Sequence, residues 1–427
     1  MKYSVLKVHN LYHQAGGEDE SVRCECAMLT RAGHRVIEFG RDNHEIDSYN
    51  FIRKASLGPR TVWAWDSCEQ IRALLHAERP DIAHFDNTFP LISPATYYEC
   101  RAAGVPVVQT LRNYRLLCPS ACFQRDGHVC EDCLGHNPWR GVLHRCYHNS
   151  RAATGAIALM LSVHRWLGTW DKAVDCYIAL TEFARAKFIQ AGLPAEKIVV
   201  KPNFVDHDPL SLPQPAGSIG NQKYADGYAL FVGRLSAEKG VATLLSAWQQ
   251  LGQGIPLRII GDGPLRAQLE ESARQQCLSN VIFEGRRNSD ETLAAMRGCR
   301  FLVFPSEWYE TFGRVAAEAF SCGVPVIASR LGAMEEIVTD GTTGLHFTPG
   351  DAGDLATKVN WALSFPEEMA AMGRSARAEY EAKYTPERNY GMLMEIYERT
   401  LDTCKRTPSA KRIQVSVREN ELQEISK

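Results

Sequence analysis

The sequence predicts an α/β fold of two doubly wound domains that face a cleft. The chain has 427 residues, which is long for one hydrophobic core and comfortable for two. Short apolar runs alternate with amphipathic stretches along nearly the whole chain, a pattern typical of βαβ units and parallel sheets. The segment 206–226 interrupts this alternation with Pro, Gly, Ser and Asn and no periodicity, so we expect a linker there.

The first domain is expected over 1–205, with a loop-like, cysteine-containing insertion at 115–150. Apolar, β-branched runs of strand length predict its strands. They are Val5–Val8, Arg35–Phe39, Asp81–Phe85, Val105–Thr110, Cys176–Leu180 and Ile198–Val200.

The second domain is expected over 227–385. Its predicted strands are Ala229–Val232, Leu257–Ile260, Val281–Glu284, Phe301–Phe304 and Val324–Ala328, with helices at Gly240–Gln250, Pro264–Cys277 and Gly313–Cys322. A further helix is expected at 386–404, and 405–427 has the composition of a polar tail.

Composition and charge exclude several classes. The net charge of −2 gives no basic excess, so we expect no nucleic-acid partner. The N-terminus lacks the apolar core of a signal peptide. The longest apolar stretch, near 152–163, is shorter than the ~20 residues of a membrane span. We therefore expect a cytoplasmic protein whose fourteen cysteines are reduced thiols or metal ligands.

The strongest candidate site lies between Phe304 and Ala319, where a buried strand is followed by the start of a helix. Glu310 precedes this helix and Glu318 lies inside it. Helix-start capping is the structural alternative for such a pair, but Glu318 stands among apolar residues, where a charge needs a partner. Because carboxylates accept hydrogen bonds, the pair suits sugar and ribose hydroxyls. The backbone at Phe312 and Gly313 offers free N–H groups for an anion.

Three further loops follow predicted strands. Arg234 and Lys239 follow the strand at 229–232, where two cations could hold a diphosphate. Gly263 belongs to a Gly-Asp-Gly-Pro loop that resembles a nucleotide loop, but residue 266 is Arg, so the dinucleotide fingerprint is incomplete. Gly16 and Gly17 follow the first strand and would let the backbone approach a ligand; a plain tight turn is the alternative.

Together these motifs resemble family 4 of the retaining glycosyltransferases, which share the two-domain, Rossmann-like GT-B fold. The resemblance covers residues 1–400 and includes the loops at 16–17, 233–240 and 261–264, the Glu310/Glu318 pair and the segment 336–345.

The resemblance implies a role for each site residue. Glu318 would bind the donor ribose, Arg234 and Lys239 the diphosphate, and Arg286 would lie along the base. Glu310 and the backbone of Phe312, Gly313 and Arg314 would hold the transferred sugar. The resemblance also implies a UDP- or GDP-sugar donor, a glycan or lipid-linked acceptor, cell-envelope polysaccharide synthesis, and no cofactor for catalysis.

One position departs from the family pattern. Many relatives carry a histidine after the fourth strand, and here Arg112 takes its place. Arginine can donate to a sugar or a phosphate but cannot shuttle a proton. His84 and Asn87, after the third strand, are alternative acceptor-cleft residues; a buried, satisfied His84 is the competing interpretation.

The insertion holds a candidate metal site, because Cys130 and Cys133 have the spacing of a zinc knuckle half and Cys118 and Cys146 could complete four thiolates. A structural zinc or free thiols are both consistent with this pattern. The segment 139–170, which mixes Trp with Arg, could contact the inner face of a membrane; an ordinary amphipathic helix is the alternative.

Two other functions remain open. A nucleotide-sugar epimerase or hydrolase of the same fold would need no acceptor. A catalytically inactive nucleotide-binding scaffold would bind donor without turnover. A phosphorylase is disfavoured because no motif for a pyridoxal lysine is present.

Overall fold

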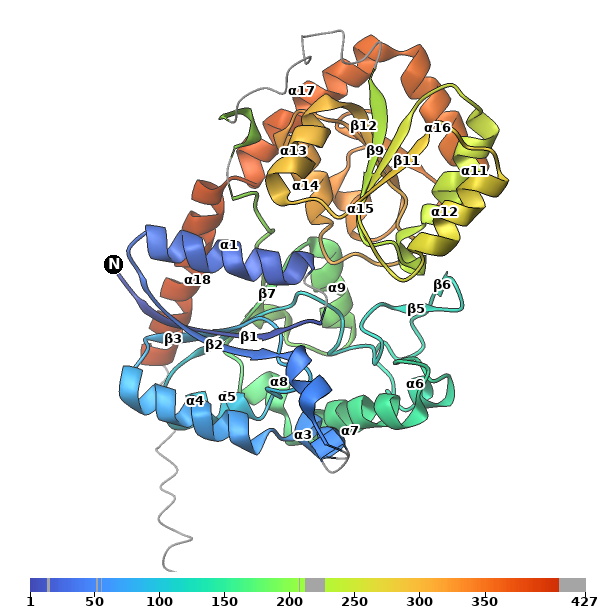
Figure 1. The fold of residues 1–427 in the computed structure, drawn as a ribbon. Helices are drawn as coiled ribbons and strands as arrows, with labels where there is room; N and C mark the ends of the chain where they lie inside the picture. Colours follow the sequence, from blue (N-terminus) through green and yellow to red (C-terminus); the bar gives the residue numbers. More distant parts are fainter. Residues whose placement is uncertain (14–15, 51–52, 55, 207, 212–226, 407–427) are drawn as a thin grey trace, which may run out of the picture.

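The computed structural model describes residues 1–13, 16–50, 53–54, 56–206, 208–211 and 227–406. It contains two α/β domains, each built on a six-stranded parallel sheet, and a long C-terminal helix that runs along the first domain (Figure 1). The predicted fold class is confirmed.

The first sheet has the strand order β2-β1-β3-β4-β7-β8. Its strands are β1 (Ser4–Leu11), β2 (Arg35–Asp42), β3 (Ile82–Phe85), β4 (Val107–Thr110), β7 (Cys176–Ala179) and β8 (Ile198–Val200). The helices of this domain are α1 (Gly17–Arg31), α3 (Leu57–Val62), α4 (Trp65–Glu78), α5 (Thr96–Ala102), α6 (Arg140–Leu143), α7 (Arg151–Leu167), α8 (Thr169–Lys172) and α9 (Glu182–Gln190). Short 3₁₀ helices are η1 (Asn43–Ser48), η2 (Ala195–Lys197) and η3 (Pro209–Ser211).

Both faces of this sheet are covered, which explains why its central strands are continuously apolar. Val5 and Ile82 pack against α1 and the C-terminal helix. Their neighbours Leu6 and Ala83 face the opposite way, toward α4, α5 and α7. The alternation follows from the two-residue period of a strand.

The second sheet has the order β11-β10-β9-β12-β13-β14. Its strands are β9 (Tyr228–Val232), β10 (Leu257–Ile260), β11 (Val281–Gly285), β12 (Cys299–Phe304), β13 (Val326–Ser329) and β14 (Gly344–Phe347). The helices are η5 (Ala237–Lys239), α11 (Val241–Leu251), α12 (Arg266–Gln275), α13 (Ser289–Gly298), α14 (Arg314–Ser321), α15 (Ala333–Ile337), α16 (Ala352–Ser364), α17 (Pro366–Lys383) and α18 (Pro386–Arg406).

Every predicted strand is present, with ends shifted by a few residues. The sequence analysis missed β14, and it missed the hairpin of β5 (Gln124–Arg125) and β6 (His128–Val129) inside the insertion. The two hairpin strands have only two residues each, so neither an apolar run nor a period can be recognised in them. Strand β14 begins with a glycine and has only two apolar residues, Leu345 and Phe347.

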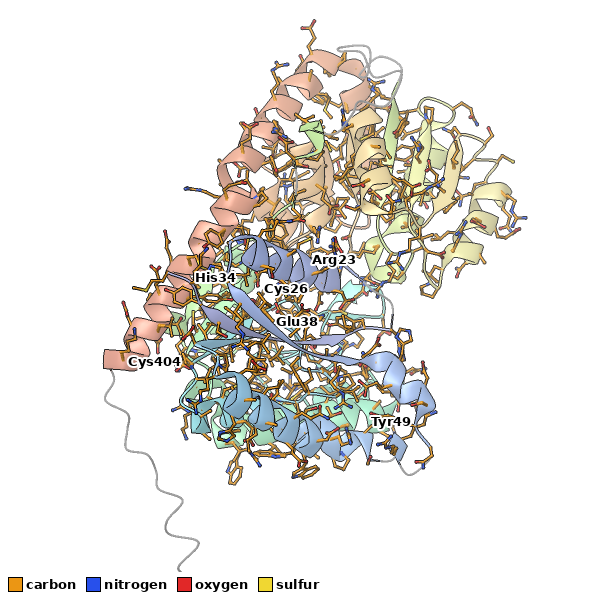
Figure 2. All side chains as sticks on the ribbon, turned by 60° about the vertical axis from the view of Figure 1, so that its left-hand side comes forward. Arg23, Cys26, His34, Glu38, Tyr49 and Cys404 are labelled. Atoms are coloured by element: carbon orange, nitrogen blue, oxygen red, sulfur yellow. The ribbon has the colours of Figure 1, made fainter. Side chains whose placement is uncertain are left out.

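Helix α18 lies on the first sheet. Its Tyr397 hydroxyl is 2.7 Å from His84 Nδ1, and its Tyr390 hydroxyl is 2.9 Å from Nε2 of His34, which Figure 2 shows beside the helix. The chain crosses between the domains just before this helix and again near 205. These two crossings touch, because the Val205 N–H donates to the Tyr384 carbonyl at 3.1 Å.

The expected polar tail, 405–427, lies outside the described residues except for Lys405 and Arg406, which end α18, and most of the expected linker, 212–226, also lies outside them. Among the helices that the structure describes, none is long and apolar enough to cross a membrane.

Candidate active site

The strand order of the second sheet reverses between β9 and β12, and ligands of doubly wound sheets bind beyond the carboxyl ends of strands at such a point. The loops that follow these two strands pack together there. The Glu307 N–H donates to the Glu238 carbonyl at 2.9 Å, and the Thr243 hydroxyl donates to the Glu307 carboxylate at 2.5 Å. The loops after β9 and β12 therefore lie together beyond the carboxyl ends of these two strands.

Glu310 is the centre of this arrangement. Its Oε1 accepts hydrogen bonds from Lys239 Nζ at 2.5 Å, Trp308 Nε1 at 2.8 Å and Ser306 Oγ at 2.9 Å. The residue is only 7% exposed. Among the described residues Oε2 has no partner, so one carboxylate oxygen is fixed by the protein and the other can accept from a ligand.

Lys239 and Arg234 differ in how firmly they are held. Lys239 is paired with Glu310 and lies over the Trp308 ring, 5.1 Å from its centroid. Arg234 is exposed, and its guanidinium makes no recorded ion pair within the described ranges. The structure thus brings Lys239 to Glu310 and leaves Arg234 at the rim. Arg286, just after β11, is likewise exposed at this edge of the sheet.

The glycines of these loops are needed mainly because the loops pack so closely on neighbouring backbone that a side chain would not fit. A side chain at Gly263 would lie 2.5 Å from the Leu235 carbonyl oxygen, and one at Gly261 would lie 1.8 Å from that of Gly233. Gly240 has φ +65°, and a Cβ there would lie 1.9 Å from the Pro305 carbonyl oxygen. Close approach of backbone at the switch point therefore explains these glycines without a ligand.

Helix α14 begins beside Glu310. Its N-cap Gly313 is left-handed, with φ +81°, and a Cβ there would lie 2.2 Å from Met334 Cε. The Phe312 side chain is buried and stacks edge-on against Tyr384, so only its backbone can face a ligand.

Glu318 and Arg314 form an ion pair one turn apart on α14, with Arg314 Nε 2.8 Å from Glu318 Oε1. Arg314 also reaches the first domain, with Nη2 3.9 Å from Glu20 Oε1 on α1. Its Nη1 is buried and has no hydrogen-bond partner among the described residues. A buried guanidinium N–H without an acceptor is unfavourable, and an anionic ligand at this domain boundary would satisfy it.

Across the boundary, Gly16 caps α1 and Gly17 begins it. The Gly16 N–H donates to Asp19 Oδ2 at 3.0 Å, and a Cβ on Gly17 would meet nothing within 4 Å. The neighbouring Glu18 was not singled out from the sequence. Its carboxylate accepts from the Tyr12 hydroxyl at 3.0 Å and from Asn113 at 3.2 Å, and burial raises its pKa.

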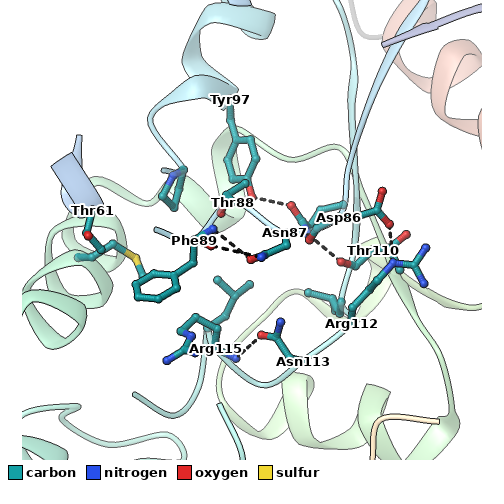
Figure 3. A pocket seen from close by; sticks show the side chains of 15 residues that line it. Thr61, Asp86, Asn87, Thr88, Phe89, Tyr97, Thr110, Arg112, Asn113 and Arg115 are labelled. Carbon is teal, nitrogen blue, oxygen red and sulfur yellow. Dashed lines mark hydrogen bonds and ion pairs between the residues drawn. The ribbon is translucent and has the colours of Figure 1, made fainter. Parts of the chain in front are cut away.

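The first domain has its own crevice, a cavity of about 30 Å³ beyond β3 and β4. Asn87 and Arg112 line it together with Asn113 and Arg115 (Figure 3). The Asn87 amide is engaged by the carbonyls of Asn10 and Phe89, which connects the loops after β1 and β3.

Arg112 does not offer a free guanidinium to an acceptor. Its Nε donates to Asp86 Oδ1 at 2.6 Å and its Nη1 to Asn203 at 2.9 Å, and Figure 3 shows it turned toward Asp86. Its backbone carbonyl instead accepts from Thr311 Oγ1 at 2.8 Å, next to Glu310. Arg112 therefore links the two domains, while two of its guanidinium nitrogens are engaged by Asp86 and Asn203.

The expectation that His84 lines the cleft is wrong. His84 is fully buried, with Nδ1 2.7 Å from the Tyr397 hydroxyl and Nε2 2.7 Å from Thr110 Oγ1. Burial, followed by the charge of Lys7, lowers its pKa to about 3, so the ring is neutral. The competing interpretation, a satisfied core histidine, is the observed one.

His84 belongs to a buried ion network under the first sheet. Lys7 Nζ lies 2.7 Å from both Glu25 and Asp86, and Lys201 Nζ lies 3.1 Å from Glu25. Glu25, His84 and Asp86 place donor atoms within 4.8 Å of one another, as in a metal site. The ammonium groups and Arg112 already neutralise these carboxylates, so the group is an ion-pair cluster.

Two doubly wound domains with facing switch-point loops, and a carboxylate–lysine pair beside a helix start, define the class of two-domain α/β proteins that bind a nucleotide ligand at the domain boundary. The comparisons with known proteins give the family. Residues 220–379 match the model for glycosyl transferases group 1, and residues 15–209 match that for glycosyltransferase family 4. The chain belongs to this glycosyltransferase family.

Three relatives illustrate the match. Glycogen synthase of Mycobacterium tuberculosis is 36% identical over 380 residues, which cover 84% of this chain and 79% of that protein. An uncharacterized glycosyltransferase of Methanocaldococcus jannaschii is 34% identical over 41% of this chain and 49% of its own. O-antigen chain mannosyltransferase C of Escherichia coli is 27% identical over 54% of this chain and 62% of its own. The match thus spans about half to two thirds of the length of the last two.

Among solved structures, HepE of Anabaena in complex with UDP has the same fold. It superposes with a TM-score of 0.66 at 20% identity, over 93% of this chain and 100% of that one.

Proposed function

We propose that the protein is a retaining glycosyltransferase that moves a sugar from a UDP- or GDP-sugar to a glycan or lipid-linked glycan acceptor. In this reaction the bond between the sugar C1 and the donor phosphate breaks. The acceptor oxygen bonds to C1 on the same face, and its proton passes to the departing phosphate. The step needs cations at the phosphate and a residue that positions the sugar.

The observation that carries the proposal is the Lys239–Glu310 pair at the switch point of the second sheet. Lys239 and the rim cation Arg234 would stabilise charge on the leaving diphosphate. Glu310, with Oε1 fixed by three donors, would position the sugar through Oε2. Glu318 would accept from the ribose, and Arg314 would supply its unpartnered N–H to an anionic oxygen.

A thermal-shift screen against UDP, GDP, ADP and NAD tests the donor assignment. UDP comes first, because it is the ligand of the Anabaena structure. A nucleotide at a hundred times its Kd should stabilise the fold by about 2.7 kcal/mol. We expect a shift with UDP or GDP that Glu318→Ala abolishes and that Ser246→Ala, a half-buried position on α11 whose hydroxyl bonds only its own helix, leaves unchanged. A folded protein without any nucleotide shift would contradict the proposal.

Assays with donor and candidate acceptors separate the rival functions. Consumption of donor without acceptor would indicate an epimerase or hydrolase, and nucleotide binding without any turnover would indicate a scaffold. Formation of a product whose anomeric configuration matches the donor's, read by NMR, is the outcome that we expect.

We further propose that the acceptor side contacts a membrane surface. An apolar groove between α3 and α7 is lined by Trp63, Trp65, Trp139 and Leu159, and Trp65 is 62% exposed. Nearby exposed cations are Arg140, Arg145, Arg151 and Arg165. Aromatic side chains beside cations suit the interface of an anionic bilayer.

Sedimentation with vesicles containing anionic phosphatidylglycerol tests this contact. We expect binding that decreases with salt and is lost in Trp65→Ser/Leu159→Ser. The control Ile282→Ser removes an equally exposed apolar side chain from the second domain. Equal binding of the double variant and the control would exclude this surface.

A further inference from the structure

Four cysteines of the insertion 115–150 meet in one small pocket. Cys118, Cys130, Cys133 and Cys146 line a cavity of about 10 Å³, a volume close to that of one water-sized particle. They come from separate parts of the segment: a turn after β4, the end of the β5–β6 hairpin, and the region after α6. The fifth cysteine of the insertion, Cys122, does not line the pocket; its thiol donates to the Ser120 carbonyl at 3.2 Å.

The segment around this pocket has little regular secondary structure, although Phe123 and Leu134 join the core of the first domain. It contains a hairpin with two-residue strands and a four-residue helix. Of the nine non-glycine residues with positive φ in the described chain, six lie in it: Ala121, Phe123, Asp126, Arg145, His148 and Asn149. Such conformations persist only where the surroundings impose them. A cross-link between the four cysteines would supply that constraint.

The chemistry of the donor set points to zinc. Four thiolates in a closed tetrahedral site are the usual ligands of structural Zn²⁺. Arg125 and Arg140 line the same pocket together with Asp132, which pairs with Arg125 at 2.6 Å. Arg140 would therefore offset part of the negative charge that four thiolates leave on the complex.

The sulfur atoms must still move closer. Among the described residues, the group whose donor atoms all lie within 4.8 Å is Glu25, His84 and Asp86, so no three of the four thiols are that tightly grouped. A tetrahedral site with Zn–S bonds of about 2.3 Å places sulfur atoms about 3.8 Å apart. The four cysteines therefore already line one pocket, and their sulfur atoms would have to move closer together to bind the ion.

We propose that Cys118, Cys130, Cys133 and Cys146 bind one structural Zn²⁺ that cross-links the insertion. All four coordination positions are filled by thiolates, so the ion takes no part in the transfer reaction.

The cross-linked segment supports the candidate active site, a consequence that rests on the proposed function. Phe123 lies between Tyr114 and Tyr309, with ring centroids at 4.9 and 6.1 Å. The Tyr114 hydroxyl donates to the Glu310 carbonyl at 3.2 Å. Glu131, between the two knuckle cysteines, pairs with Lys187 at 2.6 Å. The zinc would thus fix the wall against which the Glu310 loop packs.

Metal analysis by inductively coupled plasma mass spectrometry tests the proposal on the full chain, purified without chelator from zinc-supplemented medium. We expect about one zinc per chain in the wild type and in the matched control Cys122→Ser. Cys130→Ser and Cys146→Ser should each lose most of it. A metal-free wild type, a different metal, or equal loss in Cys122→Ser would overturn the proposal.

Thiol labelling of the wild type keeps the test valid if the serine variants fail to fold. Alkylation of the native protein should be slow at the four cysteines and become fast after chelation. Disulfides found between them by mass spectrometry would contradict a zinc site. Since neither measurement uses a nucleotide, a negative result here leaves the thermal-shift test of the proposed function unaffected.

Discussion

Lys239 Nζ lies 2.5 Å from Glu310 Oε1, which joins the loops after β9 and β12 across the point where the second sheet reverses. The pair places a cation beside a carboxylate that has one oxygen bonded by the protein and the other free to accept. Both lie at the edge of the sheet where a donor sugar would meet its diphosphate. Each residue also helps to hold the other, and Trp308 contacts both, since its Nε1 donates to Glu310 and its ring lies under Lys239.

Glu310→Gln should separate binding from transfer. The amide oxygen can still accept from Ser306 and Trp308, but the charge opposite Lys239 is lost. We expect the turnover number to fall by about 10²–10³-fold, as for loss of one positioned polar group in an active site, while nucleotide affinity changes little. Calorimetric titration with the nucleotide, alongside product assays, checks both parts. Unchanged turnover would remove Glu310 from the site.

Gly240→Ala should destabilise the fold, because its Cβ would lie 1.9 Å from the Pro305 carbonyl oxygen at a φ of +65°. A loss of more than about 2 kcal/mol in urea unfolding is expected. Gly17→Ala is the comparison, since a Cβ there meets nothing within 4 Å. Gly17→Ala should keep the stability of the wild type. Its nucleotide binding should weaken only if the donor approaches the start of α1.

Asp86→Asn should cost about 3–5 kcal/mol of unfolding free energy, because it leaves Lys7 and Arg112 as buried, undercompensated cations. Arg23→Gln, which breaks an exposed ion pair with Glu20, should cost less than about 1 kcal/mol. Denaturant unfolding at pH 7 compares the two. Similar small losses would mean that the buried network is not as tightly paired as its distances indicate.

Acidification should destabilise the protein before its carboxylates titrate. The pKa of His84 is lowered to about 3, whereas an unfolded histidine has a pKa near 6.5. Below pH 6.5 the unfolded chain therefore binds more protons, and the free energy of unfolding falls as the pH drops toward 3. His84 alone should account for about 1 kcal/mol between pH 6.5 and 5.5.

His84→Gln should reduce the change in unfolding free energy between pH 6.5 and 5.5 by about 1 kcal/mol. Denaturant unfolding of the variant and the wild type at these two pH values measures the difference. The remaining slope would come from His34, His164 and His346, whose pKa values burial also lowers. Parallel pH profiles for the variant and the wild type would show that His84 is not the group that titrates.

The fold could be predicted because it depends on local patterns. The apolar runs, the helix starts and the unpatterned segment 206–226 are all readable within a few residues, and they yielded every strand except β14 and the two strands of the β5–β6 hairpin. The loops of the candidate site were found for the same reason, since Arg234, Gly263, Arg286 and Glu310 each follow a strand.

Pairings between distant elements could not be predicted. Lys239 and Glu310 are 71 residues apart, and the two motifs that contain them point to different parts of the ligand, the diphosphate and the sugar. His84 was placed in the cleft because it ends a strand, but the parallel register sets it beside Lys7 of β1. The one available signal was Lys7 itself, a charge inside an apolar strand that must be paired.

The contact between Val205 and Tyr384 has a mechanical consequence. The two crossings of the chain are hydrogen-bonded to each other, so a rotation of one domain against the other would use them as a single hinge. Opening about that hinge would break contacts between the domains, including the bonds from the backbone of Glu182 and Phe183 to the Glu336 carboxylate. Donor entry and product exit can then occur by rotation about one axis, while α18 remains seated on the first sheet.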